Sequence, residues 1–365
     1  TQNFTTLTDT FNVAVGHSAG TAITTGAFNN LIGGLAGDAL TVGTRNVALG
    51  NSALSTDTKG SKSVAIGPNA LFTQNFTTAT DNFNTAVGAD AGLSVTTAIR
   101  NTLIGGQAGD ALTSGQDNTA VGALALSTDT LGNKSVALGR GALRDQNFTT
   151  ATDAHNIGIG YSAGLSITTG IKNTFVGGLA GDANTTGFNN IAIGFDAMGA
   201  NTASGAHVAI GFEALKTLNS TTNTSQFNTA VGTQAGKSVT TGIQNTLIGG
   251  VTGDALNTGA LNVAVGTSAL GADTKGSNSV SIGHGSLSSQ NFTTATDSNN
   301  TAVGKAAGGA VTTGISNTLI GGQAGDALTD ADNNVAVGTA ALGTDTLGSY
   351  SVAIGARALL SQNFT

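Results

Sequence analysis

Short apolar segments recur along the whole chain, and each of them ends at a glycine. The residue before this glycine is Val, Ile or Leu in all twenty segments, and the residue three before it is Val, Ile or Thr in nineteen, with Asn30 as the exception. β-Branched residues placed two positions apart are typical of a strand. The pattern therefore predicts twenty short strands, for example within 12–16, 101–105 and 351–355.

The strand-ending glycines, which we call marker glycines, run from Gly16 to Gly355 at spacings of 17, 17, 17 and 21 residues. These spacings sum to a 72-residue super-repeat. A fixed period of about 20 residues is typical of a solenoid, in which each coil buries its apolar side only against neighbouring coils. The super-repeats span 1–72, 73–144, 145–216, 217–288 and 289–360, and 361–365 begin a sixth.

We therefore predict an all-β fold, a parallel β-solenoid (β-roll) of twenty coils that forms one continuous array over 1–365. Glycine ends each strand because it adopts backbone angles that a side chain forbids. A second turn glycine follows ten residues later in the shorter coils, as at Gly26, so a second strand is expected over stretches such as 22–25. A helix is not expected, since each of the 55 glycines would cost about 1 kcal/mol against alanine in a helix.

Two further columns of like residues support stacking in register. Asn lies four residues before the marker glycine, except in the fourth coil of each super-repeat, where Ser or His207 replaces it. Stacked amides can form a hydrogen-bonded ladder along the array. Ala lies three residues after the glycine in eighteen coils, with Thr252 and Ser286 as the exceptions, which predicts a tight corner. Neither end shows a polar capping coil, so we expect the chain to be a segment of a longer fibre.

The other face of each strand is apolar as well. Two residues before the marker glycine stands Ala in most coils and a large apolar residue in the second coil of each super-repeat. A thin solenoid buries one strand face in its own core, so we expect the other face to pack against sister chains in a homo-oligomer. A single-chain rod with exposed alanines is the alternative. The expected inter-chain residues are Leu31, Leu103, Phe175, Leu247 and Leu319.

Composition excludes several classes of protein. The chain has no Cys, so it has neither disulfides nor thiol chemistry. Its formal charge of -7, with 13 Lys and Arg and none of them in a run, argues against nucleic acid or an anionic membrane surface as partner. No apolar stretch approaches the roughly 20 residues of a membrane helix, so no membrane insertion is expected.

Two segments carry a resemblance to a known family. Residues 62–70 read Lys-Ser-Val-Ala-Ile-Gly-Pro-Asn-Ala, and 350–358 read Tyr-Ser-Val-Ala-Ile-Gly-Ala-Arg-Ala. Both resemble the head repeats of trimeric autotransporter adhesins of the YadA type, and the weaker Asn-Thr-Ala-Val-Gly form in the other coils is similar to arrays in bacteriophage tail fibres. The resemblance implies a left-handed parallel β-roll that trimerises along its long axis and acts in attachment. The coils of that family are shorter and more uniform than those of this chain.

The apparent catalytic motifs belong to the repeat. Residues 16–20 (Gly-His-Ser-Ala-Gly) fit a nucleophile elbow, but the equivalent residues 88–92 read Gly-Ala-Asp-Ala-Gly, so the serine is incidental. Most aspartates recur in columns at the super-repeat period, as Asp57 and Asp129 do, which indicates turn-capping acceptors and not one active site. Bound Ca²⁺ is a minor alternative for these carboxylates. We expect no enzyme activity, no cofactor and no metal site.

The 21-residue coil is the best candidate for contact with a partner, because its longer arc carries Gln-Asn-Phe-Thr-Thr in four super-repeats and further Phe residues shortly after. Aromatic side chains repeated along a fibre can bind a host-surface glycan or protein receptor through multivalency. In the alternative interpretation, the Phe residues of the motif fold inward and fill the wider coil. The candidates are Phe4, Phe76, Phe148 and Phe292 in the motif, and Phe11, Phe83 and Phe227 after it.

From these patterns we expect a non-catalytic, extracellular fibre segment, on a cell surface or a virion, that mediates attachment as a homotrimer. A purely structural filament is one alternative. Ice binding is another, because Thr stands eight residues after the marker glycine in nearly every 17-residue coil. Every fourth coil, however, replaces this Thr with Asn, as at Asn75, so a broad regular threonine plane is not encoded.

Overall fold

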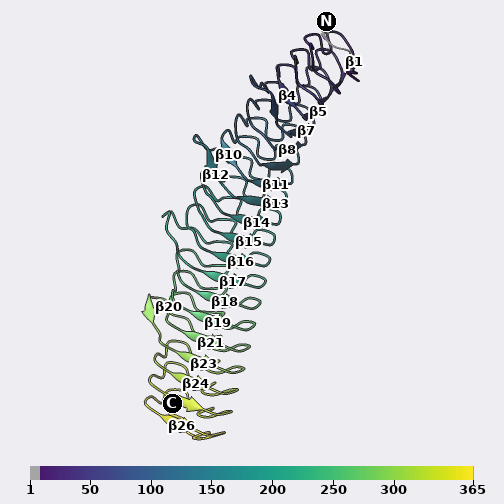
Figure 1. Ribbon diagram of the computed structural model, residues 1–365. Helices are drawn as coiled ribbons and strands as arrows, with labels where there is room; N and C mark the ends of the chain where they lie inside the picture. The colour runs from purple at the N-terminus through teal and green to yellow at the C-terminus, as the bar shows by residue number, and fades with distance from the viewer. Residues whose placement is uncertain (1–8, 365) are drawn as a thin grey trace. The chain divides into compact units, whose positions relative to one another are not determined.

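The computed structural model describes residues 9–364, which form short strands, turns and irregular segments without a helix (Figure 1). The chain divides into two compact units, Thr1–Thr186 and Gly187–Thr365, and the division falls within the third super-repeat. In each unit the chain winds through successive coils, and the strand of one coil pairs in parallel with the strand of the next. The predicted all-β parallel β-solenoid is confirmed.

The first unit contains ten parallel strands of three residues, one from each coil. The pairing is in register, so that Val13 pairs with Asn30 and Val15 with Ile32. The strands are β1 (Val13–Val15), β2 (Asn30–Ile32), β3 (Val47–Leu49), β5 (Val64–Ile66), β7 (Thr85–Val87), β8 (Thr102–Ile104), β9 (Thr119–Val121), β11 (Val136–Leu138), β13 (Ile157–Ile159) and β14 (Thr174–Val176).

The second unit repeats this arrangement with ten further strands, and Ile191 pairs with Val208 in its first pair. The strands are β15 (Ile191–Ile193), β16 (Val208–Ile210), β17 (Thr229–Val231), β18 (Thr246–Ile248), β19 (Val263–Val265), β21 (Val280–Ile282), β23 (Thr301–Val303), β24 (Thr318–Ile320), β25 (Val335–Val337) and β26 (Val352–Ile354).

Within residues 9–364, a second strand occurs only beside the 21-residue coils, where it forms two-stranded parallel sheets. In the third super-repeat this pairing is reduced to one bridge between Gly205 and Ser225. The strand predicted over 22–25 is wrong, because the main-chain N–H groups of three successive residues converge there on one carbonyl, that of Thr41, as in a turn. The two-stranded sheets pair β4 (Gly60–Ser61) with β6 (Thr80–Asp81), β10 (Gly132–Asn133) with β12 (Thr152–Asp153), and β20 (Gly276–Ser277) with β22 (Thr296–Asp297).

The marker glycines end the strands for the reason the sequence suggests. At Gly33 the backbone has φ 138°, and a Cβ there would lie 2.3 Å from the carbonyl oxygen of Gly50 in the next coil. Real Cβ atoms do not approach an oxygen so closely, and side chains rarely adopt this φ. Any residue other than glycine would therefore push two neighbouring coils apart.

From β2 onward, the central residue of each three-residue strand points into the core, and the two flanking residues point outward. Leu31, Leu103, Phe175, Leu247 and Leu319 occupy this central position and are completely buried within their own chain. The prediction that they pack between chains is therefore wrong. The coil is wide enough to hold a Leu or Phe inside a single chain, and the β-branched residues on either side form the outer surface.

The super-repeat has a physical origin in how this core is filled. Four residues after the marker glycine stands Gly in the first two coils of each super-repeat and Leu or Met in the last two. A Cβ on Gly20 or on Gly37 would lie 2.8 Å from a methyl group of Leu31, so this leucine fills the space that both glycines leave open. In the next two coils Leu54 and Leu71 supply the bulk, and the strands contribute only Ala. The large side chain thus comes from the strand in one half of the super-repeat and from the turn after the marker glycine in the other half, and the core stays filled.

In the third super-repeat, two substitutions together keep the core filled. Phe175 replaces the leucine, and Gly158 replaces the alanine of the preceding strand. A Cβ on Gly158 would lie 2.8 Å from Cγ of Leu143, which in turn lies close to the same glycine, Gly164, that contacts Phe175. The larger ring and the missing methyl group therefore compensate each other in volume.

Candidate interaction surfaces

An aliphatic stripe runs along the outside of each unit. It consists of the residue before each marker glycine, which is Val, Ile or Leu in every coil and is partly or largely exposed in every coil. Parallel strands place successive members about 4.8 Å apart. In the first unit the stripe is Val15, Ile32, Leu49, Ile66, Val87, Ile104, Val121, Leu138, Ile159 and Val176; in the second it is Ile193, Ile210, Val231, Ile248, Val265, Ile282, Val303, Ile320, Val337 and Ile354.

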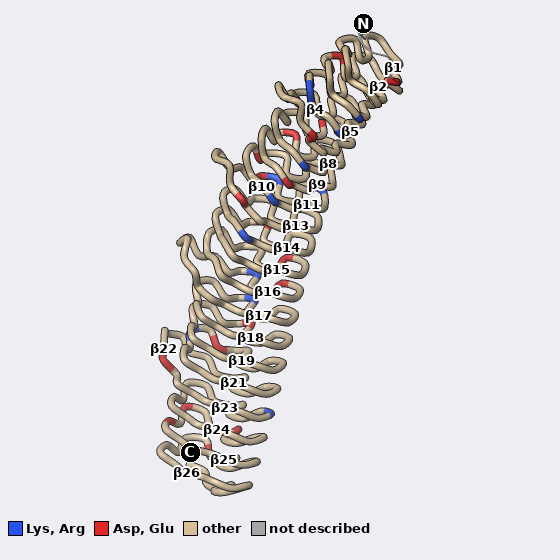
Figure 2. Tube along the Cα trace, viewed as in Figure 1, with Lys and Arg blue, Asp and Glu red and all other residues tan. Residues whose placement is uncertain are grey.

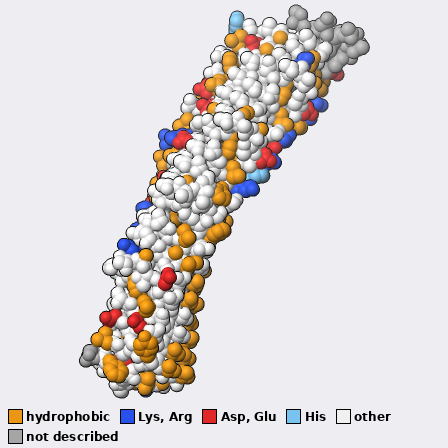
Figure 3. Space-filling model, turned by 90° about the vertical axis from the view of Figure 1, so that its left-hand side faces the viewer, with side chains coloured by type: hydrophobic (Ala, Val, Ile, Leu, Met, Phe, Trp, Pro, Cys, Tyr) orange, Lys and Arg blue, Asp and Glu red, His pale blue; other side chains and the backbone are white. Residues whose placement is uncertain are grey.

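A parallel row of Val, Ile and Thr, interrupted only by Asn30, lies two residues before the stripe and also faces outward. Figure 3 shows one side of the molecule, on which hydrophobic side chains lie in several groups, most densely along one edge of the lower part, and charged side chains are fewer. Extended apolar surface of this kind marks an interaction site in soluble proteins. The outer face of the strands is therefore a candidate interface.

A corner column flanks this face. It consists of the residue five before each marker glycine, and in all twenty coils this residue has a left-handed backbone with φ between 46° and 63°. Phe11, Phe83 and Phe227 of the sequence prediction belong to it and are 66%, 54% and 59% exposed. The structure thus leaves these three rings available at the surface.

The other predicted aromatic contacts are not at the surface. Phe76, Phe148 and Phe292 are only 5–6% exposed, so the alternative in which they fill the wider coil holds for them. Phe4 lies outside the described residues.

In the first unit the corner column combines aromatic and basic side chains. Phe11 and Phe28 stack with ring centroids 5.5 Å apart, and the guanidinium of Arg45 lies 5.4 Å from the centroid of Phe28. Lys62 Nζ lies 4.9 Å from the ring centroid of Phe83. Contacts of this kind stabilise a cation at an exposed site by about 0.5–1 kcal/mol. The column is therefore ordered by contacts between successive coils.

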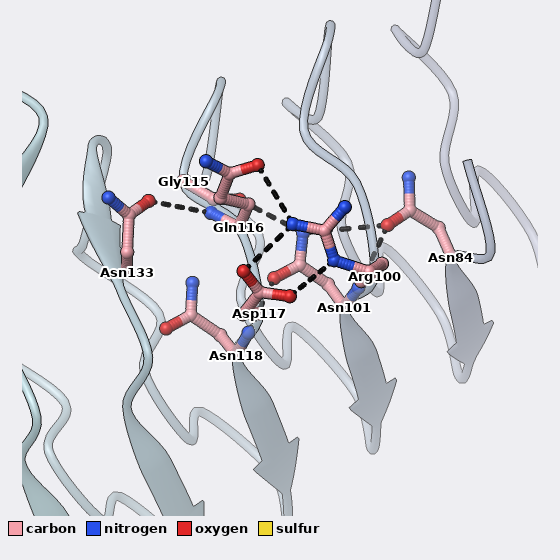
Figure 4. A network of polar contacts seen from close by, with 8 residues as sticks. All are labelled: Asn84, Arg100, Asn101, Gly115, Gln116, Asp117, Asn118 and Asn133. Carbon is pink, nitrogen blue, oxygen red and sulfur yellow. Dashed lines mark hydrogen bonds and ion pairs between the residues drawn. The ribbon is translucent and has the colours of Figure 1, made fainter. Parts of the chain in front are cut away.

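Figure 4 shows how one part of the corner column is held. Arg100 Nε lies 2.5 Å from Asp117 Oδ1, and Nη2 lies 2.9 Å from Oδ2, so the pair is bidentate between adjacent coils. The hydrogen bonds from Arg100 lower the pKa of Asp117 below its ordinary value. Arg100 is exposed and Asp117 is partly exposed, so the pair contributes little to stability and mainly fixes the position of the guanidinium.

The Asn column forms a ladder beneath this corner, also visible in Figure 4. Asn101 Nδ2 donates to the carbonyl oxygen of Gly115 at 2.9 Å, and Asn101 Oδ1 accepts the main-chain N–H of Asn118 at 2.9 Å. The predicted ladder is present, but most of its bonds join an amide to the main chain and few join two amides. Each Asn closes its own coil and fastens it to the next.

The recurring aspartates include buried turn acceptors. Asp129 Oδ1 accepts the N–H groups of Gly132 and Phe148, and Oδ2 accepts Nε2 of Gln146 at 2.6 Å. Burial raises the pKa of Asp129 even though these hydrogen bonds oppose the shift. Asp57 and Asp273 make the same contacts in their own super-repeats. The oxygens of these carboxylates accept hydrogen bonds within the turn, so they serve to hold the turn together.

The third super-repeat replaces this network as a whole. Asn201 stands in place of the aspartate, Leu218 in place of the glutamine and His207 in place of the serine. His207 is buried, its Nδ1 accepts the N–H of Asn228 at 3.3 Å, and its Nε2 lies 3.0 Å from Ser204 Oγ. A carboxylate buried here would lack its amide partner, because Leu218 replaces the glutamine, and this would be unfavourable. The neutral side chain of Asn201 avoids that cost.

We expect His207 to make stability depend on pH. Burial lowers its pKa from 6.5 to about 4, so the unfolded chain binds a proton in this range and the folded chain does not. The contribution of His207 is therefore complete above pH 6.5 and is lost as the pH falls toward 4, by about 3 kcal/mol in total. Urea unfolding at pH 7 and pH 4.5 measures the loss. The His207→Ser variant, which carries the serine of the other super-repeats, should lack the part of this pH-dependent loss that comes from His207. An equal loss of stability in the variant and the unchanged protein would contradict the assignment.

A charged cluster that does not recur lies in the second unit, where Asp196 and Glu213 occupy the turns after β15 and β16 (Figure 2). Lys216 Nζ lies 2.8 Å from Asp196 Oδ2 and 2.6 Å from Glu213 Oε1, and Lys237 Nζ lies 2.8 Å from Glu213 Oε2. The ammonium groups lower the pKa of Glu213 to about 2. The sequence interpretation missed this cluster, although four charged residues at positions that are neutral in most other coils were a readable signal.

Residues 9–364 enclose no pocket, and they contain no group of three or more His, Asp or Glu side chains placed to bind a metal ion. Within the same residues there is no helix with the length and apolarity needed to cross a bilayer. A scan against models of protein families and a search of curated proteins both found no match for this chain.

Proposed function

We propose that this chain is a non-catalytic segment of an extracellular attachment fibre, either a bacterial surface adhesin or a phage tail fibre, and that three copies associate through the aliphatic stripe. The observation that carries the proposal is the stripe itself. Every coil presents a Val, Ile or Leu to the outside, although a polar residue there would leave the core unchanged. Burial of apolar surface contributes about 25 cal/mol per Å², so burying a stripe that repeats in every coil strongly favours association.

The number of copies comes from the resemblance to trimeric adhesin repeats, and the face comes from the geometry. The corner column stands beside the stripe and carries exposed Phe11, Phe83 and Phe227. In a fibre of parallel copies such side chains recur along the length, so weak contacts with a host-surface glycan or protein add up through multivalency. These rings are the proposed receptor contacts.

The threonine column does not favour ice binding. Thr24 Oγ1 donates to the carbonyl oxygen of Thr41 at 3.1 Å, and Thr96 Oγ1 donates to that of Thr113 at 3.0 Å. These hydroxyl protons are used to join successive coils. The column is therefore explained by the stability of the solenoid.

The proposal predicts three chains per particle in light scattering of the purified protein. Because the chain has no cysteine, a single Ile248→Cys substitution reports on contact between copies. Ile248 lies on the stripe, so mild oxidation should join two chains by a disulfide, whereas Thr241→Cys, at an exposed turn, should stay reduced. A well-folded monomer at every concentration, or equal cross-linking at both positions, would contradict the assembly. Saturable glycan cleavage by the protein would contradict its non-catalytic nature.

A further inference from the structure

The two coils that carry Asp196 and Glu213 also carry an exposed pair of aromatic rings. Phe195 and Phe212 directly precede the two carboxylates, and their rings stack with centroids 6.0 Å apart and an interplanar angle of 13°. They are 51% and 45% exposed. Two turns of neighbouring coils therefore carry the ring pair and the two carboxylates of the charged cluster on consecutive residues.

These residues depart together from the repeat. None of the other super-repeats has an aromatic hydrocarbon ring at the positions of Phe195 and Phe212. They carry Asn51, Ala123, Thr267 and Thr339 at the first position, and Pro68, Arg140, His284 and Ala356 at the second. The position of Glu213 holds Gly141 in the super-repeat before it. A solenoid needs none of these side chains, because the equivalent coils stack without them. The departure is thus not explained by the fold.

The cluster retains unused hydrogen-bonding capacity. An ammonium group donates three hydrogen bonds, and a carboxylate accepts about four. Lys216 uses two donors within the cluster and Lys237 uses one, while Glu213 accepts two ammonium bonds and one from Gln234 Nε2 at 2.9 Å. Donors and acceptors held by ion pairs therefore remain available in the same turns that carry the rings.

The charges of the ion-paired residues cancel, since two carboxylates, Asp196 and Glu213, face two ammonium groups, Lys216 and Lys237. The carboxylate of Asp254 also interacts with Lys237. An anion therefore gains no net attraction from such a site. Hydroxyl groups are suited to it, because each both donates and accepts a hydrogen bond. The C–H face of a pyranose ring is suited to aromatic side chains, whose faces carry negative charge density.

We propose that Phe195, Phe212 and this charged cluster form a binding site for an uncharged pyranose saccharide. The inference deepens the proposed attachment function and rests on it, since it names the chemical class of a receptor group. The site is open and shallow, so a single copy binds weakly and the fibre gains affinity from several copies.

Saturation-transfer NMR with the full chain tests the site, with cellohexaose, maltohexaose, mannohexaose and chitohexaose as neutral probes and a hexamer of galacturonic acid as the anionic probe. We expect at least one neutral probe to bind, with contacts from its ring C–H groups and with little dependence on NaCl. The double substitution Phe195→Ala and Phe212→Ala should weaken this binding at least tenfold, and Glu213→Gln should weaken it as well.

Tyr161→Ala is the matched control, because Tyr161 is an equally exposed aromatic residue that also follows a marker glycine but lies beside Arg140, without a carboxylate cluster. It should bind as the unchanged protein does. Equal loss in this control, binding of the anionic probe alone, or no binding of any neutral probe would overturn the site. Light scattering separates this result from the proposed assembly: trimers that bind no saccharide contradict the site only, and dissociation of Phe195→Ala/Phe212→Ala trimers would make the rings a contact between copies.

Discussion

Replacing Leu247 with Asp is expected to unfold the coils around β18, with a loss of roughly 5 kcal/mol in the free energy of unfolding. Leu247 is completely buried, and Cβ atoms on Gly236 and Gly253 would lie within 3 Å of its methyl groups. The carboxylate would have no partner there and no water. Circular dichroism and urea unfolding of the full chain measure the effect.

The neighbouring substitution, Ile248→Asp, is the control. Ile248 is exposed on the aliphatic stripe, so the coil should keep its β-sheet spectrum while the particle mass falls to that of one chain. The two substitutions therefore test the two faces of one strand separately: the inner face through folding and the outer face through assembly. A folded Leu247→Asp protein would refute the inward orientation that the structure gives this side chain.

A second large effect is expected at the buried carboxylate network. Gln146→Leu removes the amide that donates to Asp129 Oδ2, and the carboxylate is then left buried with main-chain donors alone. The expected loss is roughly 3 kcal/mol at pH 7. Since burial raises the pKa of Asp129, protonation should relieve part of this loss as the pH is lowered toward 4.

The chain itself supplies the rescue. The third super-repeat carries Asn201 and Leu218 at the equivalent positions, so Asp129→Asn combined with Gln146→Leu reproduces a pairing that this solenoid already contains. The double variant should recover most of the stability at pH 7 and lose the pH dependence of the single variant. Additive losses in the two substitutions would show that the residues are not coupled.

The period, the strands and the turn glycines could be predicted from sequence because each is a local property. A glycine at fixed spacing after Val or Ile reports the backbone of its own coil, and Gly33 in the structure has the predicted role. The in-register Asn column likewise predicted that coils stack with equivalent residues aligned.

The inside and outside of the strand could not be assigned in the same way, because both faces are apolar. The interpretation assigned the face that carries Ala and Leu31 to contacts between chains, whereas the structure places this face in the core. A narrow coil is filled by volume and not by hydrophobicity. The sequence signal for the inner face was the alternation of Gly20 and Gly37 with Leu54 and Leu71. The two glycines stand in the coils where Leu31 occupies the space inside the coil.

The candidate sites divide along similar lines. Phe11 and Phe76 both follow polar turn residues in the sequence, and nothing local distinguishes the exposed ring from the buried one. The cluster around Glu213 could not be predicted from the repeat pattern, because its charged residues do not recur in the equivalent coils.

The way the core is filled also limits how such a gene can change in length. Adding or removing one coil would set a leucine such as Leu31 against another leucine, or leave two glycines facing each other across an empty space. Four coils together restore every neighbour. Unequal crossing-over in multiples of 72 residues is thus the tolerated route of growth, and the identity of distant blocks such as 101–110 and 317–326 is the trace that duplication would leave.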